Sequence, residues 1–292
     1  MTGDATVAGK AAIVVGGGSG IGRAVAVELA RQGAGVVVNS RSEAAVAAVV
    51  DDIRAAGGRA VAVAGSAADE TIADALVSRC VESFGAVDVL VNCAGIAEPA
   101  HSSILDISTA DWRAQLDSHL TTVFNTCRAV APLMVARGAG SIVNTGSFAY
   151  LGDYGGTGDP AGKGAVASLT LAMAAELKEH GIRVNAICPG ARTRLSTGPE
   201  YEAKIAELRE RGLLDEFTAQ SSLDAPPPDY AAALYVYLAS DLATTTGEIF
   251  VAAGGFVGRF VRPKLESIGY RDHAETPPWS VAELRPLFGE GS

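Results

Sequence analysis

The chain predicts an α/β protein built on a doubly wound parallel sheet with helices on both faces. Two observations predict this fold class. Short apolar runs alternate along the chain with longer helical stretches, and the runs are nearly continuous in apolar residues. Parallel strands that are covered on both faces have this composition, whereas strands with one solvent-exposed face alternate between apolar and polar residues. A glycine-rich turn at residues 16–22 follows the first apolar run and opens the first helical stretch, as in a nucleotide-binding unit.

The predicted strands are short runs rich in Val, Ile and Ala. β-branched side chains favour the extended backbone, and the turns and helices between the runs supply the crossovers that parallel strands need. Right-handed crossovers then place ligands at the carboxyl ends of the strands. In chain order the strands span residues 11–15, 35–39, 59–64, 87–92, 141–145, 182–188 and 248–253.

The predicted helices fill the intervals between the strands. They span residues 21–32, 42–56, 69–84, 109–137, 161–180 and 230–240. Two long stretches are irregular. The first, about 191–229, contains charged helical pieces and ends in three prolines, and we expect it to be a substrate lid rather than a plain surface excursion.

The domain organisation follows from these boundaries. Residues 1–255 form one nucleotide-binding and catalytic domain that includes the lid, and residues 256–292 are a C-terminal extension. The extension covers a neighbouring subunit's pocket or packs as inert surface. Its apolar residues Phe256, Val257, Phe260 and Val261 favour subunit contact because they need burial.

Composition excludes several classes of function. The chain has 292 residues and a net charge of −10, which argues against nucleic acids and anionic membranes as partners. No apolar stretch approaches the length of a membrane span, and no secretory signal is visible, so we expect a cytoplasmic protein. The four cysteines lack metal-ligand spacing, so we expect reduced thiols and no metal site.

The turn at residues 16–22 is the most informative motif. Its glycines let the backbone turn tightly and approach a ligand, and the following helix directs free N–H groups and its positive dipole end at the turn. A flexible loop can also be rich in glycine. The preceding strand and the following helix favour a site for the pyrophosphate of a dinucleotide.

Together with this turn, four further motifs resemble those of the short-chain dehydrogenase/reductase family over residues 10–255. They are Val91-Asn92-Cys93-Ala94-Gly95, Asn144-Thr145-Gly146-Ser147, Lys163, and the run from Arg183 to Gly190. The resemblance implies a Rossmann-type sheet and an NAD(P)-dependent oxidoreductase. Residues 189–194 and the tail from Pro278 to Leu284 are similar to the branch near the hydroxyacyl-CoA dehydrogenase unit of β-oxidation multifunctional enzymes.

The resemblance also implies roles for individual residues. Ser147 would orient a substrate carbonyl, and Lys163 would hold the hydroxyls of the nicotinamide ribose. The remaining cofactor contacts would come from Gly16, Ser19, Gly20, Ile21 and Gly22 at the pyrophosphate, Asn92, Ala94 and Gly95 near the adenosine, and Pro189, Gly190 and Thr193 beside the nicotinamide.

The cofactor preference depends on the residues after the second strand. An acid there would bind the adenosine ribose and repel a 2′-phosphate, but this chain has Ser40 followed by Arg41. A guanidinium suits a phosphate, so NADP is favoured over NAD, although Arg41 can also be a solvated residue before the next helix. Ser66 stands where relatives place an Asp against adenine.

The family's general acid/base, a Tyr four residues before the Lys, is replaced by Asp159. A nearby Lys lowers the pKa of a carboxyl, so Asp159 is expected to be an anion that accepts a proton and donates one poorly. The alternative interpretation makes Asp159 the N-cap of a helix that Pro160 begins. Tyr150 or Tyr154 in the neighbouring glycine-rich loop would be a substitute phenol.

His119 is a second departure, since many relatives have Asn at this place. It is either a proton-passing group or a satisfied buried His. Three functions remain open. The first is an oxidoreductase, of full or impaired activity, for a hydroxy or keto group on a bulky apolar or acyl-CoA-like small molecule. The second is a silent cofactor-binding subunit paired with an active relative. The third is a dinucleotide sensor or scaffold without dehydrogenase activity. The resemblance implies a homo-oligomer, a dimer or tetramer, or a heteromer, formed through helices 109–137 and 161–180.

Overall fold

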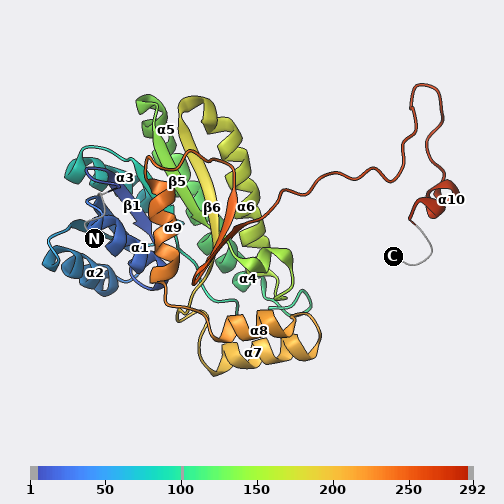
Figure 1. The fold of residues 1–292 in the computed structure, drawn as a ribbon, viewed down its shortest axis with the longest axis horizontal. Coiled ribbons are helices and arrows are strands. Elements are labelled where there is room, and N and C mark those ends of the chain that lie inside the picture. The colour runs from blue at the N-terminus through green and yellow to red at the C-terminus, as the bar shows by residue number, and fades with distance from the viewer. Residues whose placement is uncertain (1–5, 100–101, 289–292) are drawn as a thin grey trace. The chain divides into compact units, whose positions relative to one another are not determined.

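The computed structural model describes residues 6–99 and 102–288 (Figure 1). Within them, eight strands form a sheet with the order β3-β2-β1-β4-β5-β6-β7-β8. All neighbours are parallel except the last pair, β7 and β8. The predicted fold class is confirmed. The strands are β1 (Ala11–Val15), β2 (Gly35–Ser40), β3 (Arg59–Ala64), β4 (Val89–Asn92), β5 (Gly140–Thr145), β6 (Ile182–Gly190), β7 (Ile249–Ala253) and β8 (Phe256–Arg259).

Ten α-helices occur in the described residues. They are α1 (Gly20–Arg31), α2 (Glu43–Ala55), α3 (Glu70–Phe84), α4 (Thr109–Leu116), α5 (Thr122–Arg137), α6 (Gly158–Leu177), α7 (Pro199–Glu210), α8 (Glu216–Leu223), α9 (Asp229–Ala239) and α10 (Val281–Leu284). Short 3₁₀ turns follow β5 as η2 (Phe148–Leu151), α6 as η3 (Lys178–His180) and α10 as η4 (Arg285–Phe288).

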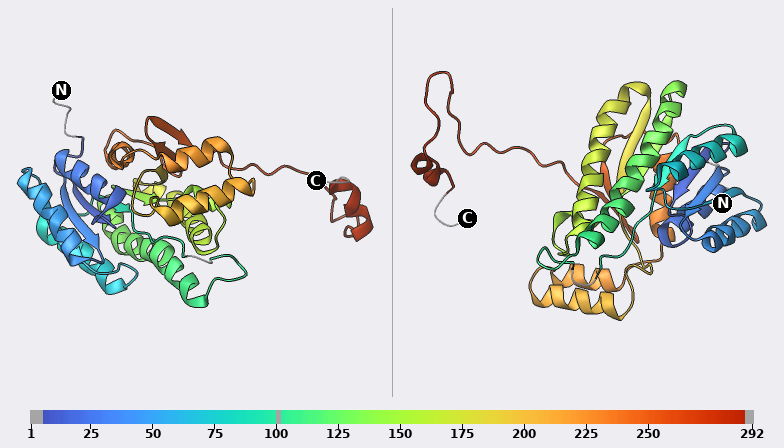
Figure 2. Two further views of the ribbon diagram at one scale, coloured as in Figure 1. Left: turned by 90° about the horizontal axis from the view of Figure 1, so that it is seen from below. Right: turned by 180° about the vertical axis from the view of Figure 1, so that it is seen from behind.

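The strands bury both faces, and each face has its own core. On β1, Ala12 and Val14 join a core with α1, α2 and α9. Ile13 and Val15 point the other way and join a core with α3, α5 and α6. Figures 1 and 2 show these helices as two layers on either side of the sheet. The period-two alternation of side chains along a strand therefore explains why β1 is apolar at every position.

The expected single helix over residues 109–137 is divided. A π-helical turn, η1 (Asp117–Thr121), separates α4 from α5. The wider turn carries His119 against α6, where His119 Cβ lies 3.0 Å from the position that a Cβ on Gly162 would occupy. Single π turns inside α-helices are frequent at functional sites. Apolar periodicity does not reveal one extra residue in a turn, so the prediction missed it.

The lid segment contains α7 and α8, which pack on each other around a small core of Ile205, Leu208, Leu214 and Ala219. Figure 1 shows this helix pair beyond one end of the sheet. Because the segment follows the carboxyl end of β6, it lies at the edge where ligands bind in parallel sheets.

The sheet continues past residue 255, because β8 pairs with β7. Among the described residues, 261–288 belong to a separate compact unit. Within that unit, the Arg271 guanidinium lies 3.8 Å from the ring centroid of Trp279 and 2.8 Å from Glu283 Oε1. Ser280 and Glu283 form a capping box at the start of α10.

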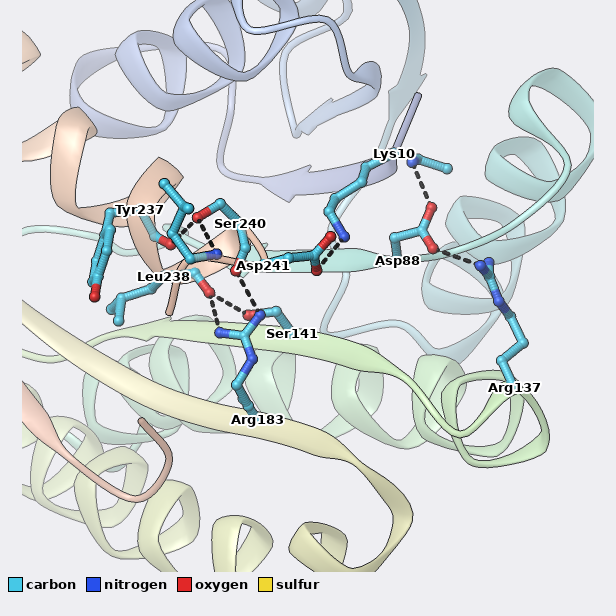
Figure 3. Close-up of polar contacts among 11 residues, drawn as sticks. Lys10, Asp88, Arg137, Ser141, Arg183, Tyr237, Leu238, Ser240 and Asp241 are labelled. Carbon is cyan, nitrogen blue, oxygen red and sulfur yellow. Dashed lines mark hydrogen bonds and ion pairs between the residues drawn. The ribbon is translucent and has the colours of Figure 1, made fainter. Parts of the chain in front are cut away.

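Charged and hydroxyl side chains fix the amino ends of the strands, opposite the carboxyl ends (Figure 3). The Arg183 guanidinium donates to the carbonyl oxygens of Leu238 at 2.6 Å and Ser240 at 2.9 Å. Ser141 Oγ donates to the same Leu238 oxygen at 2.8 Å. These bonds satisfy the free carbonyls at the end of α9 and attach that helix to β5 and β6.

Two absences concern membranes and metals. No helix among residues 6–99 and 102–288 is both long and apolar enough to cross a membrane. In the same residues, no three His, Cys, Asp or Glu side chains gather as a metal site. The four cysteines are free thiols.

Candidate active site

A cavity of about 2320 Å³ opens at the carboxyl ends of the strands and extends under α7 and α8. All but one of the residues assigned to the site from the sequence line it. The exception is Asn92, whose amide is buried. It donates to Asn144 Oδ1 at 3.0 Å and accepts from Thr126 Oγ1 at 2.9 Å. Its side chain therefore braces β4 against β5 and α5 from inside the core.

The glycine turn forms a close-fitting cradle. Gly16 has φ +79°, and a Cβ there would lie 2.6 Å from the backbone nitrogen of Ala94. A Cβ on Gly22 would collide with the Gly16 carbonyl. At the start of α1, the Ser19 side chain caps no N–H and the first turn carries no acid. These N–H groups and the helix dipole are therefore available to an anion in the cavity.

The end of the cavity next to β2 carries a free cation. Ser40 Oγ lies 2.6 Å from the position of a Cβ on Gly18, so its side chain stands against the glycine turn. Arg41 lines the cavity and has neither a hydrogen bond nor an ion pair within the described residues. Asn39 donates to the carbonyls of Val63 and Gly65 and thereby fixes the turn that carries Ser66.

Lys163 and Ser147 lie at the end of β5. The Lys163 side chain is buried, and its Nζ donates to the Thr145 carbonyl at 3.0 Å. Burial lowers the pKa of Lys163, while the charge of Asp159 opposes the shift. Ser147 Oγ accepts from the Ala149 N–H at 3.1 Å. Because this bond uses an oxygen lone pair, the hydroxyl proton of Ser147 remains available to a ligand.

Asp159 does not cap α6, so the N-cap prediction is wrong. The helix begins at Gly158 with Thr157 as its N-cap, and Asp159 lies within the first turn. Its side chain lines the cavity and is 21% exposed. The cap comes instead from Glu98, far away in sequence, whose carboxylate accepts from the first N–H groups of the helix. Asp159 is thereby free for another role.

The expected direction of the pKa shift of Asp159 is also wrong. Burial raises the pKa of this carboxyl, and the charge of Glu98 adds to the rise. The charges of Lys163 and Lys204 oppose it. The expectation gave the charge of Lys163 more weight than burial, but in the folded protein the loss of water around the carboxyl, which disfavours the charged form, is the larger effect.

His119 is a neutral, buried ring beside Asp159. Its Nε2 lies 2.9 Å from Gln115 Oε1 and 3.3 Å from Asp159 Oδ1. Gln115 Nε2 donates to the Ala97 carbonyl, so Gln115 Oε1 must accept, and the His119 proton belongs on Nε2. Nδ1 has no hydrogen-bond partner among the described residues.

Burial and the charge of Lys163 lower the pKa of His119 to about 2. The backbone of Ile96 opposes this shift, although it forms no well-aligned hydrogen bond with Nδ1. His119 therefore cannot hold a second proton near neutrality. It can donate from Nε2 to the Asp159 carboxylate and orient it.

Two glycines of α6 allow this close packing. A Cβ on Gly158 would lie 2.6 Å from Gln115 Cγ, and one on Gly162 would lie 3.0 Å from His119 Cβ. Gln115 and His119 are four residues apart, as are the two glycines, so the two helices meet along matching faces. Larger residues at either glycine would move Asp159 away from His119.

The two candidate phenols differ in position. Tyr154 lines the cavity, but its hydroxyl lies 3.1 Å from Ser222 Oγ on α8. Tyr150 is not among the lining residues, and its ring packs edge-on against Phe260 at 5.3 Å between centroids. Neither hydroxyl is bonded to Lys163 or Asp159.

Sequence reasoning missed Glu98, Gln115 and Lys204. Glu98 lies in an irregular segment, and Gln115 and Lys204 lie on helices as ordinary polar residues. Only the four-residue spacing of Gln115 and His119 hinted at a pair on one helix face. Long-range packing brings the other two residues to the site, and no local pattern signals it.

Comparisons with known proteins agree with this geometry. A family model described as short chain dehydrogenase matches residues 10–198. Cyclohexanol dehydrogenase of Acinetobacter sp. (strain SE19) is 35% identical over 251 residues, covering 86% of this chain and 96% of that protein. The (2S)-[(R)-hydroxy(phenyl)methyl]succinyl-CoA dehydrogenase subunit BbsD of Thauera aromatica is 32% identical, covering 84% and 96%. A crystal structure of a short chain dehydrogenase from Mycobacterium avium matches with TM-score 0.79 and 35% identity, covering 97% and 94%.

Proposed function

The chain belongs to the short chain dehydrogenase family, and from this premise we propose an NADP(H)-dependent oxidoreductase in which Asp159 carries the proton. The substrate is a hydroxy or keto compound. The observation that carries the proposal is the placement of Asp159, in the cavity and 3.3 Å from His119, with its pKa raised by burial. A raised pKa lets a carboxyl hold a proton that it can give to a substrate oxygen.

The lining of the cavity suits a nicotinamide dinucleotide that carries a 2′-phosphate, such as NADP. The glycine turn, the uncapped start of α1 and the unpaired Arg41 supply backbone N–H groups and a cation along one side. When bound, the nicotinamide of such a cofactor exchanges a hydride with the substrate carbon. Arg41 favours NADP over NAD, because a guanidinium pairs with a 2′-phosphate.

The chain's own residues handle the oxygen of the substrate. Ser147 donates its free hydroxyl proton to that oxygen and polarises the carbonyl. Asp159 gives its proton to the oxygen in the direction of reduction and recovers a proton from water; in oxidation its carboxylate accepts the alcohol proton. Lys163 holds ribose hydroxyls through the protons that its bond to Thr145 leaves free.

The size of the cavity, which the lid helices α7 and α8 partly enclose, indicates the size of the substrate. The cavity of about 2320 Å³ exceeds the roughly 300–1,000 Å³ of ordinary small-molecule sites. Cofactor space accounts for part of this, and α7 and α8 bound the remainder. We infer a bulky apolar or acyl-CoA-like substrate. A named relative acts on cyclohexanol and another on a succinyl-CoA derivative, which supports this range.

One observation favours a second candidate, a cofactor-binding subunit without turnover. A carboxyl is shorter than a phenol, and neither Tyr150 nor Tyr154 is bonded at Lys163. The relative from Thauera aromatica is itself named as a subunit. In this case the chain would pair with an active relative through the helices α4, α5 and α6, where Phe124 is 48% exposed.

The two candidates are separated by binding and turnover. Nicotinamide fluorescence is titrated with NADPH and NADH, and oxidation of each is followed with a panel of bulky ketones and 3-ketoacyl-CoA esters. Turnover that Asp159→Asn removes supports the oxidoreductase. Tight NADPH binding with no turnover, combined with activity gained by Asp159→Tyr, supports the silent subunit. Failure to bind either coenzyme contradicts both.

A further inference from the structure

Glu98 is held by the first turn of α6. Its Oε1 accepts from the N–H groups of Thr157 and Gly158, both at 3.0 Å. Its Oε2 accepts from the N–H of Asp159 at 2.6 Å. A carboxylate from the segment after β4 thus satisfies three donors of a helix that begins about sixty residues later in the chain.

The surroundings fit this carboxylate closely. A Cβ on Gly156 would lie 3.0 Å from Glu98 Cδ, and Gly156 has φ +82°, so a side chain there would crowd the carboxylate and strain the backbone. The Ser102 hydroxyl also favours the ionised form of Glu98. Together these donors hold the pKa of Glu98 below its ordinary value in spite of burial.

Asp159 faces charged and titratable groups from four directions. Lys163 belongs to its own helix, Lys204 to α7, and the neutral ring of His119 to η1. Glu98 is the carboxylate that acts on Asp159 from the segment after β4. Two cations therefore favour the ionised form of Asp159, while burial and one fixed anion favour the protonated form.

We propose that Glu98 keeps the proton on Asp159. It is a positioning residue, and the proposal rests on the proposed role of Asp159 as proton carrier. Glu98 acts in two ways in the same direction. As an anchored anion it repels a second negative charge beside it, and as a cap it neutralises the positive end of α6, which otherwise favours an anion in the first turn.

When one proton is available to the two carboxyls, it therefore binds to Asp159, which has fewer hydrogen-bond donors than Glu98. Glu98 has three backbone donors and stays ionised. Asp159 shares one N–H, that of His119, with Gln115. Two neighbouring carboxyls whose surroundings differ in this way separate into a permanent anion and a proton carrier.

The test measures the titration of Asp159 directly and needs no turnover. The full chain is labelled with ¹³C at the carboxyls of Asp and Glu, and the carboxyl signals are followed by NMR from pH 3 to pH 8. Asp159→Asn assigns the signal of Asp159, and Glu98→Gln assigns that of Glu98. The same signals can be assigned in the wild type by through-bond correlation with the backbone. In the wild type, Asp159 must titrate at higher pH than Glu98, and the reverse order overturns the proposal even if no variant folds.

The second measurement uses Glu98→Gln. The midpoint of Asp159 is expected to fall by about 1 pH unit or more, the scale of a neighbouring charge in a protein. Glu176→Gln is the matched control, because it removes one carboxylate from the exposed far end of α6 and must leave the midpoint unchanged. A folded Glu98→Gln variant with an unshifted midpoint overturns the proposal.

Turnover separates this inference from the proposed function. If the protein is active, the pH at which carbonyl reduction declines must move down with the Asp159 midpoint in Glu98→Gln. If the NMR midpoint moves while Asp159→Asn leaves turnover unaltered, the role of Glu98 stands and the proton-carrying role of Asp159 fails.

Discussion

Replacing Asp159 by Asn removes the proton and keeps the shape of the side chain. The amide oxygen can still accept from His119 Nε2, at 3.3 Å from Oδ1 in the wild type. The packing of α6 against η1 is therefore preserved, and NADPH binding should be unchanged because Asp159 lies outside the glycine cradle. The expected loss is confined to turnover.

The size of that loss follows from the role of the group. General acid–base catalysis contributes about 10²–10⁴ in rate, which is roughly 3–5 kcal/mol of the barrier. Wild-type carbonyl reduction should also decline by about tenfold per pH unit above the pKa of Asp159, since the protonated form is needed. Alcohol oxidation should rise over the same range, since it needs the carboxylate. The variant should lose both dependences.

Asp159→Asn should lower turnover but should not lower the thermal stability of the protein. The pKa of Asp159 is raised in the folded state from its ordinary value of 3.8, so the folded protein binds this proton more tightly than the unfolded chain. The free energy of unfolding therefore falls as the pH rises from that value through the folded-state pKa. Asn carries no such penalty, so at neutral pH the variant should unfold at the same or a higher temperature.

Steady-state rates, a pH profile and thermal unfolding check these expectations together. The exposed Asp51→Asn on α2 is the control for loss of a carboxylate. If Asp159→Asn reduces ketones at the wild-type rate with the wild-type pH profile, the proton comes from another group and the reasoning is refuted. A rate loss that accompanies unfolding would indicate a structural role instead.

The remaining predictions concern the cofactor and the scaffold. Arg41→Ala should weaken NADPH binding by roughly 1–3 kcal/mol, the scale of a charged hydrogen bond, and leave NADH binding unaffected; equal losses in fluorescence titrations would remove the reason for favouring NADP. Gly16→Ala should abolish binding of either coenzyme, because φ is +79° and the new Cβ meets the backbone of Ala94. Gly9→Ala has a similar φ of +76° with open space around it, so it serves as the control and should lower stability by only about 1–2 kcal/mol. Arg183→Met should lower the free energy of unfolding by about 2–4 kcal/mol, because it removes two charged hydrogen bonds at the end of α9; a urea midpoint equal to the wild type would contradict this.

The order of strands and helices could be predicted from the chain. The apolar runs, their separation by helical stretches and the glycine turn are local features, and they specify a parallel sheet with a ligand edge. The π turn η1, the paired lid helices and the final antiparallel strand were not predicted as such. Each depends on packing against distant segments, which periodicity within one window does not report.

The site divides in the same way. The residue types were readable, including Ser147, Lys163 and the acid at position 159. The direction of the pKa shift of Asp159 was not readable, because it depends on lost water and on a carboxylate from another segment. The neighbouring Lys163 suggested a lowered pKa, whereas burial in the folded protein raises the pKa of Asp159.

The sequence by itself determined the sheet, the glycine cradle and the presence of an acid, Asp159, four residues before Lys163, since these depend on residue identity and short-range pattern. Only the tertiary structure decided that Glu98 caps α6, that His119 is neutral and that the pKa of Asp159 rises. Hydrogen bonds and burial set the energy of a charge, and both are made by residues that are distant along the chain and adjacent only after folding.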